Sequence, residues 1–129
     1  MAIYAPGLLI AGGIYHLFFG FFHIAFWRTN ILNWHKELPH MSPTNRAVIQ
    51  MLNAGVIVFL FLIAYISLLY SRELLTPGLG RALLLGTSIF WLARLAGEFA
   101  LKDGAPAKPG LVVASAIGIL LYLLPAVTI

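Results

Sequence analysis

The sequence contains no cysteine, and charged residues make up only 9% of its 129 residues. Without cysteine the chain has no disulfide, no thiolate metal site, no CxxC redox centre and no cysteine nucleophile. Soluble domains usually carry about 25% charged residues, whereas 61% of this chain is hydrophobic. A water-facing surface cannot be built from so few charges, and we therefore expect lipid to surround the protein.

Acidic residues are scarcer than basic ones, with four Asp and Glu against eight Lys and Arg, and the net charge is +4. No basic run with interleaved aromatic residues suggests a nucleic-acid surface, so we expect no nucleic acid as a partner. In a membrane protein, a basic excess is typical of anchoring at the anionic cytoplasmic face of the bilayer.

Four apolar segments are separable, at about Gly7–Trp27, Ala47–Leu69, Leu79–Leu101 and Gly110–Val127. Each has close to the roughly 20 residues that cross a ~30 Å hydrocarbon core. Helices are the only open-ended structure that satisfies its own backbone in lipid. The sequence therefore predicts an all-α membrane protein, an antiparallel up-down bundle of four transmembrane helices in one domain, 1–129. We expect the first segment to be a retained span, because no basic residue precedes it.

The connections carry recognisable signals. Ser42-Pro43 and Thr76-Pro77 each place a cap residue before a proline and predict helix starts. The short connection 71–78 predicts a tight antiparallel hairpin between the second and third spans. The connection 28–45 has two open interpretations, a short interfacial helix with Trp34 at headgroup level or a surface loop. The third connection is punctuated by Gly104, Pro106, Pro109 and Gly110.

Basic residues are distributed unevenly over the two sides of the predicted bundle. The first and third connections carry five: Arg28, Lys36, Arg46, Lys102 and Lys108. The other side has only two, Arg72 and Arg81. The positive-inside rule then places the five-residue side in the cytoplasm and both termini outside it. We expect the protein in the plasma (inner) membrane.

Two charges lie inside the third apolar segment. A charge at a helix centre in lipid costs on the order of 2.5–3.5 kcal/mol, so Arg94 and Glu98 need partners or a task. At about 1.5 Å per residue, Arg94 lies roughly 10 Å and Glu98 roughly 5 Å inside the cytoplasmic end. Polar residues of the first two spans reach the same leaflet, which predicts a ligand-binding site formed by Arg46, Gln50, Asn53, Arg94, Glu98, His16 and His23.

Glu98, Gln50 and Asn53 each have two interpretations. Arg before Glu at a spacing of four is the less favourable order, and Glu98 lies near the negative end of its helix dipole. We therefore expect Glu98 to face a second cation, such as Arg46, His23 or a ligand. The alternative is a buried network that only fixes helix register. Gln50 and Asn53 either orient a ligand or hold helices together, with Asn53 bonding to the third span.

His16 and His23 share a helix face but lie roughly 10.5 Å apart, too far to bind one metal together. No other span contains histidine, which argues against a bis-histidine haem within one protomer. A mixed site of His23 and Glu98 has only two ligands. We expect no metal, and the sequence indicates no particular cofactor; the alternative role for these histidines is packing.

The residues from Arg46 to Asn53, with Leu52 before Asn53, resemble the start of the second helix in the MAPEG family of membrane glutathione and eicosanoid enzymes. Those proteins are also small four-helix bundles, and many have an arginine in the third helix, where Arg94 stands. The resemblance covers two of four spans. The family's basic-His pattern and following acidic residue are absent, with Ala47, Val48, Met51 and Val56 in that stretch.

Three functional hypotheses follow. In the first, the protein binds a lipid-like or amphipathic small molecule through its polar residues, with the tail between Phe19, Phe22 and Trp91, as a homo-oligomer or an accessory subunit of a membrane complex. In the second, it is a small MAPEG-like transferase or isomerase, with Glu98 or His23 as the catalytic acid or base and Arg94 polarising the substrate. In the third, it is a purely structural subunit.

Overall fold

The structure is a computed structural model that describes residues 2–101 and 108–129. Its long helices are α1 (Ala5–Ile24), α3 (Pro43–Leu69), α5 (Leu79–Ala100) and α6 (Lys108–Thr128). Short elements join them: η1 (Ala2–Tyr4), η2 (Ala25–Trp27), α2 (Trp34–Glu37), η3 (Leu38–His40) and α4 (Ser71–Leu74). All four long helices are long and apolar enough to cross a membrane, which confirms the predicted all-α bundle. Lys102, Gly104 and Pro106 of the third connection lie outside the described residues.

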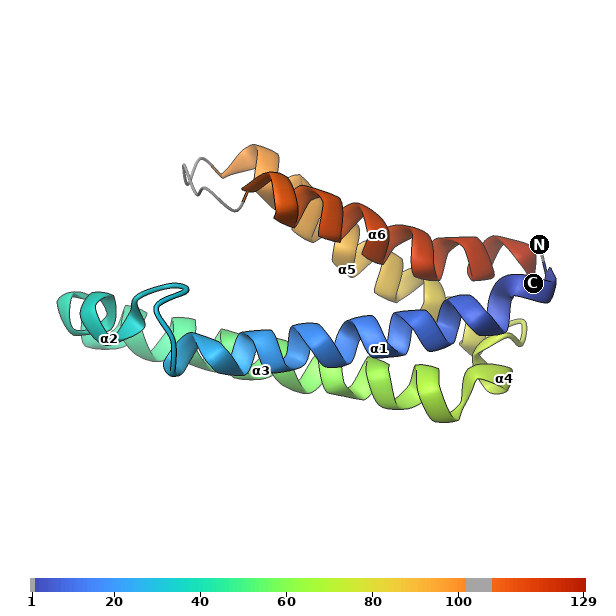
Figure 1. Ribbon diagram of the computed structural model, residues 1–129, viewed down its shortest axis with the longest axis horizontal. Coiled ribbons are helices and arrows are strands. Elements are labelled where there is room, and N and C mark those ends of the chain that lie inside the picture. The colour runs from blue at the N-terminus through green and yellow to red at the C-terminus, as the bar shows by residue number, and fades with distance from the viewer. Residues whose placement is uncertain (1, 102–107) are drawn as a thin grey trace.

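The four long helices form two pairs, α1 with α3 and α5 with α6, and α1 also packs against α6. Successive long helices run in opposite directions (Figure 1). The pairs meet at the end that holds both chain termini and α4, which we call the closed end, and they separate toward the end that holds α2, the open end. The expected tight hairpin between α3 and α5 is wrong, because each of these helices packs mainly along a different partner.

Glycines explain this choice of partners. A Cβ at Gly13 would come within 2.6 Å of Leu68, and one at Gly20 within 2.8 Å of Phe61, so α1 and α3 approach closely only because α1 lacks side chains there. Gly118 has the same role between α6 and α5, against the ring of Trp91. Gly12 likewise admits the ring of Tyr122, so glycines allow close contacts within both pairs and also between α1 and α6.

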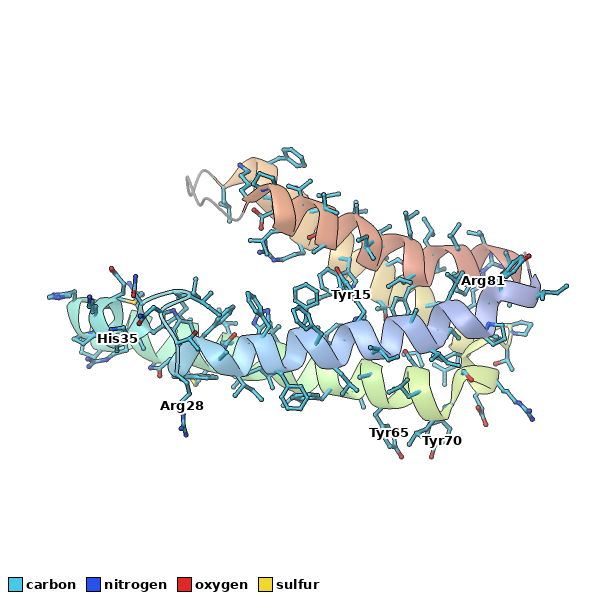
Figure 2. The ribbon with its side chains drawn as sticks, viewed as in Figure 1. Tyr15, Arg28, His35, Tyr65, Tyr70 and Arg81 are labelled. Atoms are coloured by element: carbon cyan, nitrogen blue, oxygen red, sulfur yellow. The ribbon has the colours of Figure 1, made fainter. Side chains whose placement is uncertain are left out.

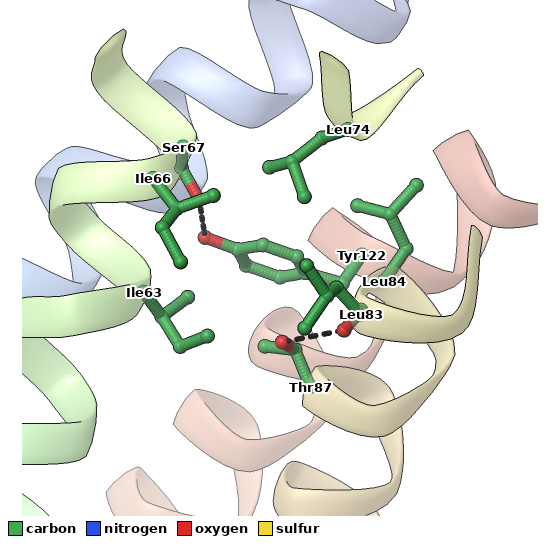
Figure 3. Close-up of a pocket in the computed structure, with 8 residues that line it drawn as sticks. All are labelled: Ile63, Ile66, Ser67, Leu74, Leu83, Leu84, Thr87 and Tyr122. Carbon is green, nitrogen blue, oxygen red and sulfur yellow. Dashed lines mark hydrogen bonds between the residues drawn. The ribbon is translucent and has the colours of Figure 1, made fainter. Parts of the chain in front are cut away.

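The closed end has a packed apolar core. It consists of Leu9, Ile63, Leu74, Leu84, Tyr122 and Ala126. A gap of about 10 Å³ remains beside Tyr122, whose hydroxyl reaches Ser67 (Figure 3). That volume holds about one water, so the gap is a packing defect and no ligand site.

The helix starts agree with the sequence at one site and differ at the other. The hydroxyl of Ser42 accepts a hydrogen bond from the backbone N–H of Asn45 at 3.2 Å, which confirms the predicted cap of α3. The predicted start at Thr76 is wrong, because its hydroxyl donates to the carbonyl of Glu73 at 2.6 Å and closes α4. Helix α5 begins after Gly78, whose φ of 84° turns the chain in a conformation that favours glycine.

The first connection contains a short helix, α2, as one of its two predicted interpretations required. Asn33, in the left-handed region with φ of 51°, precedes α2. Trp34 is 5% exposed and packs edge-on against Phe26 and Trp27, with ring centroids 5.7 and 5.3 Å apart. Trp34 thereby packs α2 against η2, which follows α1.

Candidate functional site

A cavity of about 470 Å³ lies between the two helix pairs, toward the open end. Pockets for small ligands span about 300–1,000 Å³, so this one can enclose a whole molecule. All four long helices contribute to it, together with η2 and two residues of the first connection. Its lining consists of Phe19, Phe22, His23, Phe26, Ile31, Leu32, Val56, Leu60, Phe90, Trp91, Arg94, Leu111, Ala114 and Ser115.

Five aromatic rings form much of the wall. They come from Phe19, Phe22, Phe26, Phe90 and Trp91, and most of them meet edge to face, with centroids 5.4 Å apart for Phe19 and Trp91 and 5.2 Å for Phe22 and Phe26. Such contacts fix ring orientation. The three residues expected along a ligand tail, Phe19, Phe22 and Trp91, therefore all line the cavity.

Among the residues that the structure describes, His23 is one of two strongly polar side chains in the lining. Its Nδ1 lies 2.8 Å from Oδ1 of Asn53, and Nδ2 of Asn53 donates to the backbone carbonyl of His23 at 3.1 Å. Only the amide nitrogen can donate to a carbonyl, so the amide oxygen faces Nδ1, and Nδ1 carries the proton. The other ring nitrogen, Nε2, is left as an acceptor with no hydrogen-bond partner within residues 2–101 and 108–129.

Gln50 makes a similar contact one turn nearer the open end. Its side-chain oxygen accepts from Nε1 of Trp27 at 3.0 Å, and its nitrogen donates to the carbonyl of Arg46 at 3.0 Å. Asn53 and Gln50 thus hold the end of α1 and the η2 segment that follows it. The alternative in which Asn53 bonds to the third span is wrong, since its partner is His23 of the first. Neither Gln50 nor Arg46 lines the cavity.

Substitution of Asn53 tests this contact. We expect Asn53→Leu to lower the free energy of unfolding by about 1–2 kcal/mol, because Nδ1–H of His23 and the end of α1 lose their buried partner. Thermal unfolding in detergent measures the change. Asn45→Leu is the matched control, since Asn45 is exposed on the same helix. Equal losses in the two variants would contradict a specific role for the Asn53 amide.

Arg94 is the second strongly polar group of the lining, and it forms an ion pair with Glu98, one turn along α5. The side chain of Glu98 is 3% exposed, whereas that of Arg94 is 42% exposed. The expected second cation, Arg46 or His23, is not the partner that the described residues provide. The local pair that the helix dipole disfavours is formed because a buried carboxylate without a cation would cost more. Glu98 does not line the cavity.

On the closed-end side of the cavity, polar side chains from the four long helices meet at a buried junction. They are His16, Ser67, Trp91 and Tyr122. Nδ1 of His16 lies 2.8 Å from the carbonyl oxygen of Gly12 and therefore carries its proton, and Nε2 accepts from Nε1 of Trp91 at 3.2 Å. The hydroxyl oxygen of Tyr122 lies 3.3 Å from Nδ1 and 2.8 Å from Oγ of Ser67.

We call these four side chains the four-helix junction, and in it His16 has a structural role. His16 has no exposed surface and lies outside the cavity lining. It contacts Trp91, whose ring forms part of the cavity wall. Nearby, Tyr15 points from α1 into the gap between the pairs, and its hydroxyl donates to the carbonyl of Ala114 on α6 (Figure 2).

The structure thus divides the seven predicted site residues into separate groups. His23 and Arg94 line the cavity, and Asn53 lies behind His23. Gln50 contacts Trp27 and the carbonyl of Arg46, Glu98 pairs with Arg94, and His16 lies at the junction. Sequence reasoning missed the contribution of α6, since its wall residues Leu111, Ala114 and Ser115 are small or aliphatic. Tyr122, the one aromatic residue of α6, was the signal that could have pointed to this helix.

No group of three or more His, Cys, Asp or Glu side chains close enough to hold a metal occurs within the described residues. Comparisons with protein-family models, with curated proteins and with solved structures find no match to this chain. What the fold itself establishes is the class of the molecule: with four apolar helices, the chain is a small multi-pass integral membrane protein.

Proposed function

We propose that this protein binds a lipid-like, amphipathic small molecule in the cavity between its helix pairs. The observation that carries the proposal is the composition of the wall. Aromatic and aliphatic side chains make up most of it, and within the described part of the chain its strongly polar groups are His23 and Arg94. Binding sites typically combine such apolar walls with a few polar groups that orient the ligand. The polar head would bind at His23 and Arg94, and the tail would lie along Phe19, Phe22 and Trp91.

The proposed orientation places this cavity in the inner leaflet of the plasma (inner) membrane. The open end carries Arg28, which points away from the bundle (Figure 2), together with Lys36 and Arg46. The closed end has Arg72 and Arg81. The basic excess at the open end supports a cytoplasmic location for it, so a ligand would enter from the cytoplasmic half of the bilayer.

Native mass spectrometry of the detergent-extracted protein tests the proposal. We expect a co-purified mass beyond that of the protein, and the same spectra report whether the chain forms a homo-oligomer or joins a partner in a membrane complex. If wild-type protein carries no added mass and takes up no amphiphile when it is offered, the proposal is wrong, and a purely structural role gains support.

A substitution that fills the cavity tests where the ligand binds. We expect Ala114→Phe to reduce ligand binding at least tenfold, because its ring occupies the space between the pairs, while the carbonyl that Tyr15 contacts is unchanged. Val113→Phe is the control, since Val113 is the neighbouring residue on α6, is 58% exposed and lies outside the lining. Native mass spectrometry compares the bound fractions. Equal occupancy of the two variants would place the ligand elsewhere.

A further inference from the structure

We propose that the polar head of the ligand is an uncharged aromatic hydroxyl, a phenol or quinol, and not an anion. This inference rests on the proposed function and specifies its ligand. It follows from three features of the same cavity: the proton position on His23, the charge balance of Arg94, and the shape of the wall.

The first feature is the acceptor that His23 presents. The reciprocal contact with Asn53 fixes the proton on Nδ1, so Nε2 offers a lone pair and no hydrogen. A carboxylate or a phosphate dianion has only acceptor oxygens and would face this lone pair with another. A neutral ligand with an O–H group donates to it. The contact with Asn53, which holds the imidazole from behind the cavity wall, therefore selects for a donor in the ligand.

The second feature is the charge of Arg94. Its cation is already paired with the buried carboxylate of Glu98, so the two together are neutral. An anionic head would have to share Arg94 with the carboxylate of Glu98. That carboxylate is 3% exposed, so water cannot replace the charge contact that it would lose. The guanidinium nevertheless has five N–H donors, more than Glu98 can use. Arg94 can therefore donate to a neutral oxygen without loss of its ion pair.

These two residues together define the head. Arg94 offers donors and His23 offers an acceptor, and both line one cavity. A hydroxyl group is the smallest group that accepts and donates at once. An ether or an ester can only accept, and an ammonium can only donate.

The third feature favours a ring behind the hydroxyl. Five aromatic side chains surround the cavity, and the rings of Phe22 and Phe26 both pack against the imidazole of His23. The ring centroids of His23 and Phe26 are 4.7 Å apart, so a group bonded to Nε2 lies among aromatic edges and faces. Flat rings pack well in such surroundings. The alkyl tail would lie along Phe19 and Trp91 and the aliphatic side chains of Val56, Leu60 and Leu111, which come from both helix pairs.

Three probes with the same ring and tail test the head group: para-decylphenol, para-decylanisole and para-decylbenzoate. The phenol has an O–H donor, the anisole replaces it with a methyl ether, and the benzoate is an anion. Binding to the wild-type protein in lipid nanodiscs is measured by titration calorimetry. We expect the phenol to bind about tenfold more tightly than the anisole, the effect of one hydrogen bond in a partly buried site, and more tightly than the benzoate.

The variant His23→Phe keeps an aromatic ring but removes the acceptor. We expect it to bind the phenol and the anisole equally, whereas the control His35→Phe, exposed on α2 at the open end (Figure 2), keeps the tenfold difference. The wild-type comparison of the three probes stands even if His23→Phe folds poorly. Equal binding of phenol and anisole to the wild type, or tightest binding of the benzoate, would overturn the hydroxyl head while leaving the amphiphile site intact. Failure of all three probes to bind would overturn the proposed function as well.

Discussion

Replacement of His16 with leucine should lower the free energy of unfolding by about 2–4 kcal/mol, the largest effect expected in this chain. Leucine has a similar volume but offers no acceptor, so Nε1–H of Trp91 would be buried without a partner. Tyr122 would retain only its contact with Ser67. Inside a membrane protein, water cannot replace the hydrogen bonds that Trp91 and Tyr122 lose, so the native state is destabilised.

Reversible unfolding in mixed micelles measures this loss, with His35→Leu as the control because His35 is exposed. A second background makes the test specific. In Trp91→Phe protein no indole N–H remains to be orphaned, so His16→Leu should there cost less than about 1 kcal/mol. An unchanged cost in that background would show that His16 stabilises the bundle by packing alone.

The second large effect is expected from a single added methyl group. Gly118→Ala should cost about 2–3 kcal/mol, because the new Cβ would lie 2.5 Å from Cγ of Trp91. Trp91 cannot simply rotate away, since its indole N–H is bonded to His16 at 3.2 Å. Either α5 and α6 separate or the ring moves into the cavity, and in the second case binding of the amphiphile falls as well.

Gly86→Ala is the matched control for this substitution. Gly86 is exposed on α5, and no atom beyond its neighbours lies within 4 Å of its Cβ position. Alanine has the higher helix propensity by about 1 kcal/mol, so Gly86→Ala should leave stability unchanged or raise it slightly. Thermal unfolding with and without para-decylphenol separates the two effects. If Gly118→Ala matched Gly86→Ala in both measurements, the close contact at Trp91 would not limit the fold.

Hydropathy was sufficient to predict the spans, since α1, α3, α5 and α6 each begin and end within four residues of the predicted bounds. It could not predict which faces meet. In lipid both the buried and the exposed faces of a helix are apolar, so Phe18 at 63% exposure and Phe19 at 9% look alike in the sequence. The partners of α3 and α5 depended on close contacts at single glycines, which have no periodic signature.

The candidate site was predicted only in part, because the sequence did not show which face of each helix points inward. Depth along each helix placed His23 and Arg94 in the same leaflet, and both line the cavity. Depth says nothing of rotation about the helix axis, which directs Gln50 and Asn53 toward α1 and leaves Glu98 behind Arg94. Ile31 and Leu32 enter the wall from a connection whose path no helical pattern describes.

The four-helix junction also has a consequence for the order in which the molecule assembles. Its side-chain contacts join residues 55, 75 and 106 positions apart, whereas the contact between His23 and Asn53 spans 30. Contacts between distant residues form late, because a longer stretch of chain must be ordered first. We therefore expect the α1–α3 and α5–α6 pairs to form as separate helical hairpins in the bilayer. The buried imidazole of His16 would then join the two hairpins in the last step.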